Sequence, residues 1–123
     1  MTGNSIILAV DRNQRNLELL SQFLNKEGYQ MLAASDLEDA ARAIGQPARI
    51  KMALVDISGF DRRIWDCCEQ LQSHQIPFLI LSPKQSAAIG HESFSRGARS
   101  ILVKPLIVRD LLFVIHSLLG EPA

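Results

Sequence analysis

Four polar residues come directly after apolar stretches of the chain: Asp11, Asp56, Ser82 and Lys104. An ionised aspartate is a competent nucleophile, and an ammonium group and a hydroxyl are suitable partners for negatively charged oxygens. The four side chains can act together only if the fold brings the ends of these stretches to one place. The elements between them therefore decide whether they form a site.

Two hydrophobic periods alternate along the chain. Short runs without a polar face are typical of buried parallel strands, and apolar residues three and four positions apart are typical of amphipathic helices. The predicted strands cover residues 5–10, 29–34, 51–55, 78–81 and 100–103. The predicted helices cover 13–27, 35 or 36–44, 61–73, 85–96 and 107–119.

Strict alternation of strand and helix predicts an α/β fold. Its expected architecture is three-layered and doubly wound: five parallel strands joined by right-handed crossovers, with helices on both faces. At 123 residues the chain is expected to be a single domain, 1–123, with its core at about 5–119. In such sheets function gathers at the carboxyl ends of the strands, where the four polar residues are predicted to converge.

The charge balance of the chain bears on which kinds of partner it can bind. Thirteen basic residues balance thirteen acidic ones, so no overall field favours nucleic acid or a membrane surface. We expect neither as a direct partner. The two cysteines, Cys67 and Cys68, are adjacent in sequence, where a mutual disulfide would be strained. Together with the lack of a long apolar run, this predicts a reducing, cytoplasmic setting.

In these features the sequence resembles the response-regulator receiver family, over nearly its whole length. The resemblance is carried by Asp11, Asn16, Asp56, Ser82 and the closing pairs Gly97-Ala98 and Lys104-Pro105. It implies a flavodoxin-like strand order of 2-1-3-4-5. It also implies a two-component signalling protein that receives a phosphoryl group from a histidine kinase or phosphotransfer protein and acts on a downstream protein target.

The resemblance assigns roles to individual residues. Asp56 is implied to be the phosphoacceptor, Lys104 to pair with a phosphoryl oxygen, and Ser82 to hydrogen-bond another. The peptide bond before Pro105 is implied to be cis, which orients the lysine. A receiver of this kind is a phosphoprotein switch and no enzyme, apart from self-catalysed phosphoryl transfer.

The resemblance also implies a Mg²⁺ cofactor, held by Asp11, Asp56 and the backbone carbonyl of Ser58. Family members carry two consecutive acids after the first strand, whereas here Arg12 follows Asp11. Losing one carboxylate and gaining a cation weakens a magnesium site. We therefore predict weak or absent metal binding and weakened phosphorylation, with Arg12 pairing with Asp56 in competition with the metal.

Two further departures concern signalling. Pro83 follows Ser82 where the family keeps a small residue, and Ile101 occupies the aromatic switch position. These departures keep an alternative open: a pseudo-receiver that acts as a phosphorylation-independent interaction or dimerisation module. A flavodoxin-like enzyme or nucleotide binder is disfavoured because no glycine follows the first strand.

Simpler roles also remain open for two site residues and for the last helix. Asp11 is placed to cap the first helix, and Ser82 to cap the fourth. The last helix carries more apolar residues than one buried stripe requires: Leu111, Leu112, Val114, Ile115, Leu118 and Leu119. Part of this surface is a candidate face for a homodimer or a docking partner.

Overall fold

A computed structural model describes residues 6–46 and 50–120. The strands are β1 (Ile6–Val10), β2 (Gln30–Ala34), β3 (Ile50–Asp56), β4 (Phe78–Ser82) and β5 (Ser100–Val103). The helices are α1 (Gln14–Lys26), α2 (Leu37–Gly45), α3 (Ile64–Ser73), α4 (Ala87–Ser95) and α5 (Val108–Leu119). The predicted alternation is confirmed, although Ser5, the expected first strand residue, lies outside the described residues.

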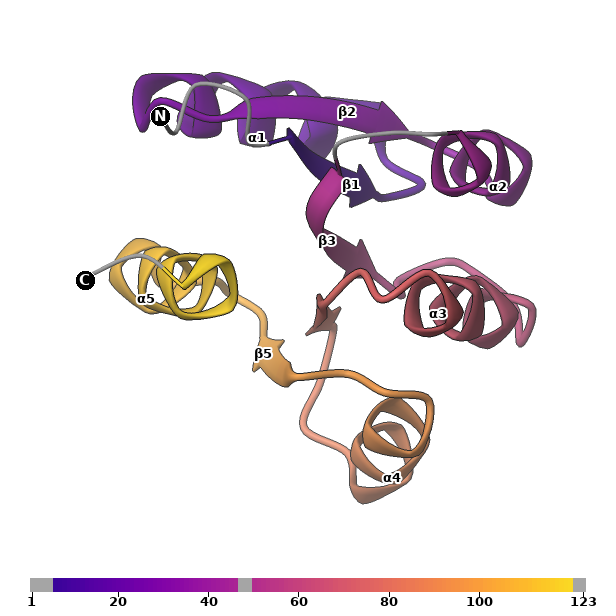
Figure 1. The fold of residues 1–123 in the computed structure, drawn as a ribbon. Helices are drawn as coiled ribbons and strands as arrows, with labels where there is room; N and C mark the ends of the chain where they lie inside the picture. Colours follow the sequence, from indigo (N-terminus) through magenta and orange to yellow (C-terminus); the bar gives the residue numbers. More distant parts are fainter. Residues whose placement is uncertain (1–5, 47–49, 121–123) are drawn as a thin grey trace.

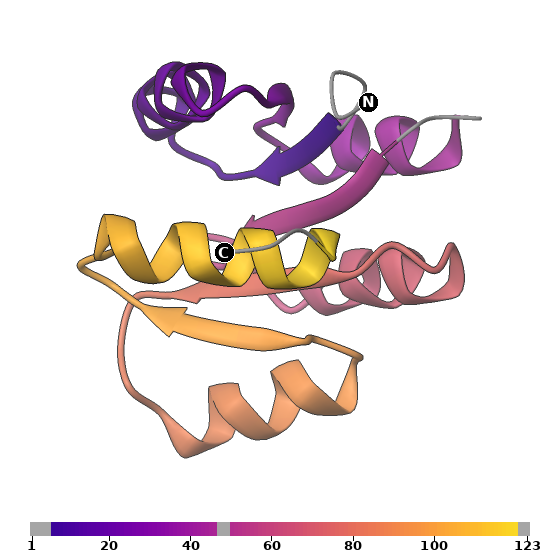
Figure 2. The ribbon, with the colours of Figure 1, turned by 60° about the vertical axis from the view of Figure 1, so that its left-hand side comes forward.

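The five strands form one parallel sheet in the order β2-β1-β3-β4-β5, as the resemblance implied. Figure 2 shows the strand arrows pointing the same way, so their carboxyl ends share one edge of the sheet. The register aligns Val10 with Val55, and Asp56 with Leu81. Ser82 in turn aligns with Val103. The residues at the ends of these four strands are therefore neighbours.

Helices cover both faces of the sheet. In Figure 1, α1 and α5 lie on one side of the strands, and α2, α3 and α4 lie on the other. Successive residues of a strand point to opposite faces, so β3 serves both layers. Met52 and Leu54 pack with the core under α1 and α5, whereas Ala53 and Val55 pack with the core under α2 and α3. A strand buried on both faces has no polar side, which explains its uninterrupted apolar sequence.

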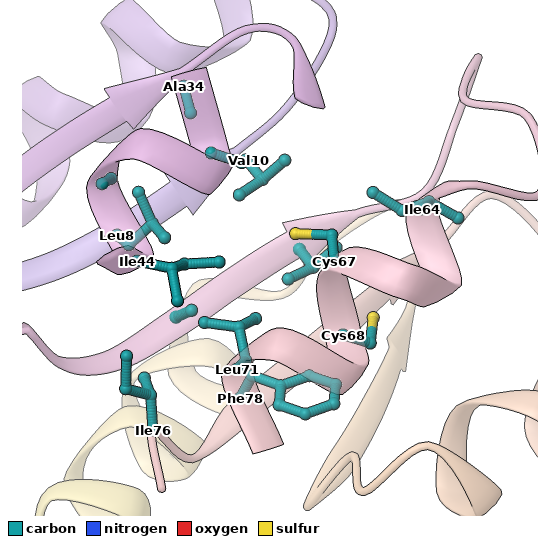
Figure 3. Packing of buried hydrophobic residues seen from close by; sticks show 14 of the residues in the cluster. Leu8, Val10, Ala34, Ile44, Ile64, Cys67, Cys68, Leu71, Ile76 and Phe78 are labelled. Carbon is teal, nitrogen blue, oxygen red and sulfur yellow. The ribbon is translucent and has the colours of Figure 1, made fainter. Parts of the chain in front are cut away.

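The core beneath α2 and α3 is shown in Figure 3, where Leu71, Ile76 and Phe78 lie close together. Cys67 and Cys68 belong to this cluster, and both are free thiols. Burial raises the pKa of the Cys67 thiol to about 11. A buried thiol with so little thiolate character is inert, so these cysteines act as small apolar core residues.

Short polar residues fix where three helices begin. The side chains of Asn13, Asp36 and Ser86 accept hydrogen bonds from backbone N–H groups in the first turns of α1, α2 and α4. Asp36 is thus the cap of the second helix. The other two caps exclude Asp11 and Ser82 from the capping role that the sequence left open for them.

The starts of α3 and α4 lie three and two residues later than predicted. At α3, the carboxylate of Asp61 accepts the backbone N–H of Arg63 at 2.9 Å, which closes a turn ahead of Ile64. At α4, the cap at Ser86 delays the start of the helix to Ala87. In both cases a local side-chain hydrogen bond overrides the apolar periodicity.

The surplus apolar residues of α5 are divided between core and solvent. Leu111 and Ile115 are buried, and Val114, Leu118 and Leu119 pack partly against the same core cluster. The exposed apolar side chains of the helix are instead Val108 and Phe113, at 56% and 63% exposure. None of the helices in residues 6–46 and 50–120 is long and apolar enough to span a membrane.

Candidate phosphoacceptor site

The four residues singled out from the sequence meet at the carboxyl edge of the sheet. Asp11, Asp56 and Ser82 are buried, with exposures of 8%, 3% and 0%. Polar side chains are seldom buried to this extent unless they are paired. Lys104 follows β5 and reaches back across the edge to the carboxylate at the end of β3.

Asp56 and Lys104 form the central contact of the site. The Lys104 Nζ lies 2.5 Å from Asp56 Oδ2 and 3.2 Å from the hydroxyl of Ser58. The other carboxylate oxygen, Asp56 Oδ1, accepts the backbone N–H of Ser58 at 2.9 Å. Because ionised partners make the strongest hydrogen bonds, this network holds the carboxylate in one orientation beside a cation. The peptide bond between Lys104 and Pro105 is cis, as expected.

The side chain of Ser58 is a participant that the sequence did not reveal, since the resemblance assigned only its backbone carbonyl. Its hydroxyl helps to hold Lys104 over the carboxylate. Position alone could have raised Ser58 as a candidate, because it stands two residues after Asp56. The sequence cannot predict which way its hydroxyl points.

The hydroxyl of Ser82 is engaged within its own loop. It donates to the backbone carbonyl of Lys84 at 2.7 Å, within the loop that leads to α4. Pro83 is exposed in that loop. The hydroxyl must therefore exchange this local hydrogen bond for any contact with a group on Asp56.

Asp11 is a second buried carboxylate in the same crevice. It accepts the backbone N–H of Asn13 at 2.8 Å, and the side chain of Asn16 also favours its ionised form. Burial raises the pKa of Asp11 above its ordinary value, and the neighbouring carboxylate of Asp56 adds to the rise. The hydrogen bond from Asn13 opposes this shift without cancelling it. The ionised form of Asp11 is thus held at a cost to the fold.

We expect Asp11→Asn to stabilise the fold at neutral pH, because the amide keeps an acceptor oxygen for Asn13 and removes the buried charge. The pKa of Asp11 is higher in the folded protein than its ordinary value of 3.8, so the charged carboxylate destabilises the fold. This destabilisation grows as pH rises from 3.8 to the folded-state pKa. The advantage of the variant should therefore be full at pH 7 and vanish below pH 3.8. Urea unfolding at several pH values measures it, and an equal gain at all pH values would contradict the assignment.

Arg12 does not pair with Asp56, so that prediction is wrong. Its guanidinium carbon lies 5.8 Å from the ring centroid of Phe60, within the range of a cation–π contact. Lys104 already occupies the position beside the carboxylate of Asp56. The aromatic ring offers Arg12 an alternative that the order of residues could not indicate.

An apolar groove opens beside the carboxylates, between α1 and α5. This cavity of about 320 Å³ has Asp56, Asp11 and Lys104 on its wall. The remainder of its lining is Asn16, Leu19, Leu20, Phe23, Leu81, Leu106, Val108 and Leu111. Leu19 and Val108 are 48% and 56% exposed, so the groove presents apolar surface to solvent. A surface groove of this kind is typical of a binding site.

The comparison with protein families decides the identity. Residues 7–116 match the response regulator receiver domain. The chain belongs to this family. Receiver domains are signalling switches of two-component systems and are generally not enzymes.

Curated relatives agree with this assignment. The receiver is 31% identical over 121 residues to the transcriptional regulatory protein GltR of Pseudomonas aeruginosa. The match covers 95% of this chain and 49% of GltR. It is 28% identical over 119 residues to the transcriptional regulatory protein ResD of Bacillus subtilis, covering 96% of this chain and 49% of ResD. The chain thus spans about half the length of these relatives.

Solved receiver structures share the fold. The receiver domain protein of Methanospirillum hungatei, described as CheY-like, superimposes with a TM-score of 0.85 at 25% identity over 94% of both chains. The chemotaxis protein CheY4 of Vibrio cholerae gives a TM-score of 0.79 at 27% identity, covering 93% of this chain and 98% of that one.

Receiver domains generally bind Mg²⁺ at an acidic pocket, but the donor set of this receiver does not fit that ion. Asp11 and Asp56 are the two carboxylates that line the crevice, Lys104 lies beside Asp56, and Arg12 follows Asp11 where the family carries a second acid. Within the described residues, no group of three His, Cys, Asp or Glu side chains could hold a metal. Mg²⁺ is bound octahedrally by oxygen ligands and is attracted by negative charge, so two carboxylates beside two cations make a poor site for it.

Proposed function

We propose that this receiver accepts a phosphoryl group on Asp56 and passes the signal to a protein partner. The observation that carries the proposal is the contact between Asp56 and Lys104, with a cation 2.5 Å from a carboxylate that is only 3% exposed. In transfer, an Asp56 oxygen forms the new bond to phosphorus. The bond between phosphorus and the donor's leaving atom breaks, and that atom keeps the electron pair.

The residues around Asp56 have distinct tasks in the proposed reaction. Lys104 offers its charge to a phosphoryl oxygen, and Ser58 holds the ammonium group in place. Ser82 leaves the carbonyl of Lys84 and donates its hydroxyl to another phosphoryl oxygen. This exchange moves the loop between β4 and α4, which provides a route from phosphorylation to a change of surface.

The phosphodonor in this proposal is a histidine kinase or a phosphotransfer protein. Support comes from the apolar groove between α1 and α5, which exposes Leu19 and Val108 and reaches the wall formed by Asp56. A small phosphodonor needs no such surface, whereas an apolar partner face would bury it. The donor's phosphorylated group would then enter along the groove.

The output surface in this proposal lies around β5. Phe94 of α4 and Phe113 of α5 are 56% and 63% exposed, on the two helices that flank this edge strand in Figure 1. A cavity of about 560 Å³ beside α4 includes Ile89, Phe94 and Ile101 in its lining. This face is assigned to the downstream protein target or to a second copy in a homodimer.

The balanced charge of the chain supports an output through protein contacts rather than direct contact with nucleic acid. The free thiols of Cys67 and Cys68 support a cytoplasmic location. Residues 1–123 form one receiver domain in this proposal.

Intact-mass spectrometry after incubation with acetyl phosphate tests the proposal. The expected result is the gain of one phosphoryl group by the folded protein and none by the urea-unfolded protein, because only the fold sets Lys104 beside Asp56. If the folded protein gains nothing in any buffer, with or without Mg²⁺, the phosphoryl switch is excluded. The receiver would then be a phosphorylation-independent interaction module.

Removing the cation should slow the same reaction. We expect Lys104→Gln to reduce the labelling rate about ten- to a hundredfold, since hydrogen bonds to charged groups contribute roughly 1.5–3 kcal/mol. Lys51→Gln, an exposed change in β3, is the matched control and should leave the rate unchanged. Equal rates for the Lys104 variant and the wild type would remove Lys104 from the mechanism.

A further inference from the structure

Arg12 lies against the loop that follows Asp56, where it lines a cavity of about 230 Å³ together with Phe60, Asp61 and Asp36. A Cβ added at Gly59 would stand 3.7 Å from Arg12 Cδ, so the side chain lies along this loop. Its guanidinium then reaches the ring of Phe60 at 5.8 Å. Arg12 follows Asp11 directly, and Gly59 and Phe60 stand three and four residues after Asp56. Arg12 and Phe60 therefore belong to the two loops that follow the carboxylates of the crevice.

The guanidinium of Arg12 is free to receive an anion. Among residues 6–46 and 50–120, no carboxylate forms an ion pair with it, and its side chain is exposed. The acid in the adjoining loop, Asp61, forms its ion pair with Arg63 at 3.0 Å, and the charge of Arg12 helps to lower its pKa without a direct contact. An arginine carries five N–H donors in a planar fork, which suits the oxygens of a phosphoryl group.

The charge of Arg12 can stand in for the charge of a divalent metal ion. With an acid at position 12, this position would carry one negative charge; Arg12 carries one positive charge, a difference of two. A divalent metal ion brings the same two charges. A phosphoryl group carries about −1.5 to −2, so it needs this compensation from some source. Here the protein itself can supply it.

We propose that Arg12 and Lys104 together hold the phosphoryl oxygens on Asp56 in place of a divalent metal, so that phosphorylation of this receiver is independent of Mg²⁺. The inference rests on the proposed phosphorylation of Asp56. Phe60 holds the guanidinium beside the loop that follows Asp56 until the phosphoryl group arrives. Arg12 then leaves the face of the ring and turns to a phosphoryl oxygen.

The first part of the test measures metal binding without any phosphodonor. Isothermal titration with Mg²⁺ should give no binding heat for the wild type and clear binding for Arg12→Asp, which adds a free carboxylate beside Asp11. Arg15→Asp makes the same charge change on an exposed arginine of α1, and should behave like the wild type. Mg²⁺ binding by the wild type as tight as by Arg12→Asp would overturn the inference.

The second part compares acetyl phosphate labelling in EDTA with labelling in Mg²⁺. The labelling rates of the wild type in the two media should agree within about twofold. Arg12→Asp should be labelled at least about tenfold more slowly in EDTA than in Mg²⁺, since the substitution changes the charge near the phosphoryl group by two units. Arg12→Gln, which removes the cation without adding a ligand, should be about tenfold slower than the wild type in both media.

The outcomes separate this inference from the function on which it rests. Wild-type labelling only in Mg²⁺ would overturn the role of Arg12 and leave Asp56 as the acceptor. Wild-type labelling in neither medium would overturn both. An Arg12→Gln variant that is labelled in EDTA as fast as the wild type would show that Arg12 holds no phosphoryl oxygen. Circular dichroism of each variant confirms that the exposed substitution leaves the fold intact.

Discussion

Asp56→Asn is expected to abolish phosphoryl uptake from acetyl phosphate. The amide has the shape of the carboxylate and can still accept the backbone N–H of Ser58, but it is not a nucleophile of comparable strength. Lys104 loses its ionic partner in the variant, yet its side chain is 28% exposed and can remain hydrated. The variant should therefore fold normally while its intact mass stays unchanged.

The matched control for this substitution is Asp39→Asn. Asp39 is an acid of α2 whose carboxylate is 40% exposed and pairs with Arg42. This variant should be labelled at the wild-type rate, because its charge lies outside the crevice. Labelling of Asp56→Asn at a comparable rate would mean that another side chain accepts the phosphoryl group.

Phe78→Ala should be among the most destabilising substitutions. Phe78 is 0% exposed and belongs to the cluster beneath α2 and α3, where Figure 3 shows it beside Leu71. Removing a buried phenylalanine leaves a cavity in a closely packed interior and costs about 3–5 kcal/mol. A domain of this size has only about 5–15 kcal/mol of stability, so the urea midpoint should fall sharply.

Phe113→Ala provides the control on the same chain, since Phe113 is 63% exposed. It loses the same atoms from the surface of α5 and should shift the midpoint little. Similar shifts for the two variants would contradict the packing described for the core beneath α2 and α3.

The fold was predictable because its signals are local and repeated. Apolar runs such as Ile7 to Val10 have no polar face, and they alternate with helical stripes, which leaves few arrangements other than a doubly wound sheet. The same alternation placed Asp56 and Lys104 at one edge, and their contact is present. Strand ends are reliable markers because parallel strands share a carboxyl edge.

The details that sequence reasoning missed depend on contacts between distant segments. Arg12 was expected beside Asp56, but Phe60 holds its guanidinium and Lys104 occupies the place at the carboxylate. Apolar periodicity likewise did not tell which residues of α5 face outward, and Phe113 is exposed while Leu119 is partly covered. Rotamers and the orientation of a helix on the sheet are set by packing, which no single stretch of sequence contains.

The central claim is that the carboxylate of Asp56 receives the phosphoryl group, and chemical trapping tests it most directly. Borohydride reduces an acyl phosphate to an alcohol, which marks the modified aspartate permanently, and peptide mapping by mass spectrometry then locates it. After acetyl phosphate treatment of the wild type, the reduced residue is predicted at position 56. A reduced residue at Asp11 or elsewhere, or none in a folded and fully mapped protein, would contradict the account.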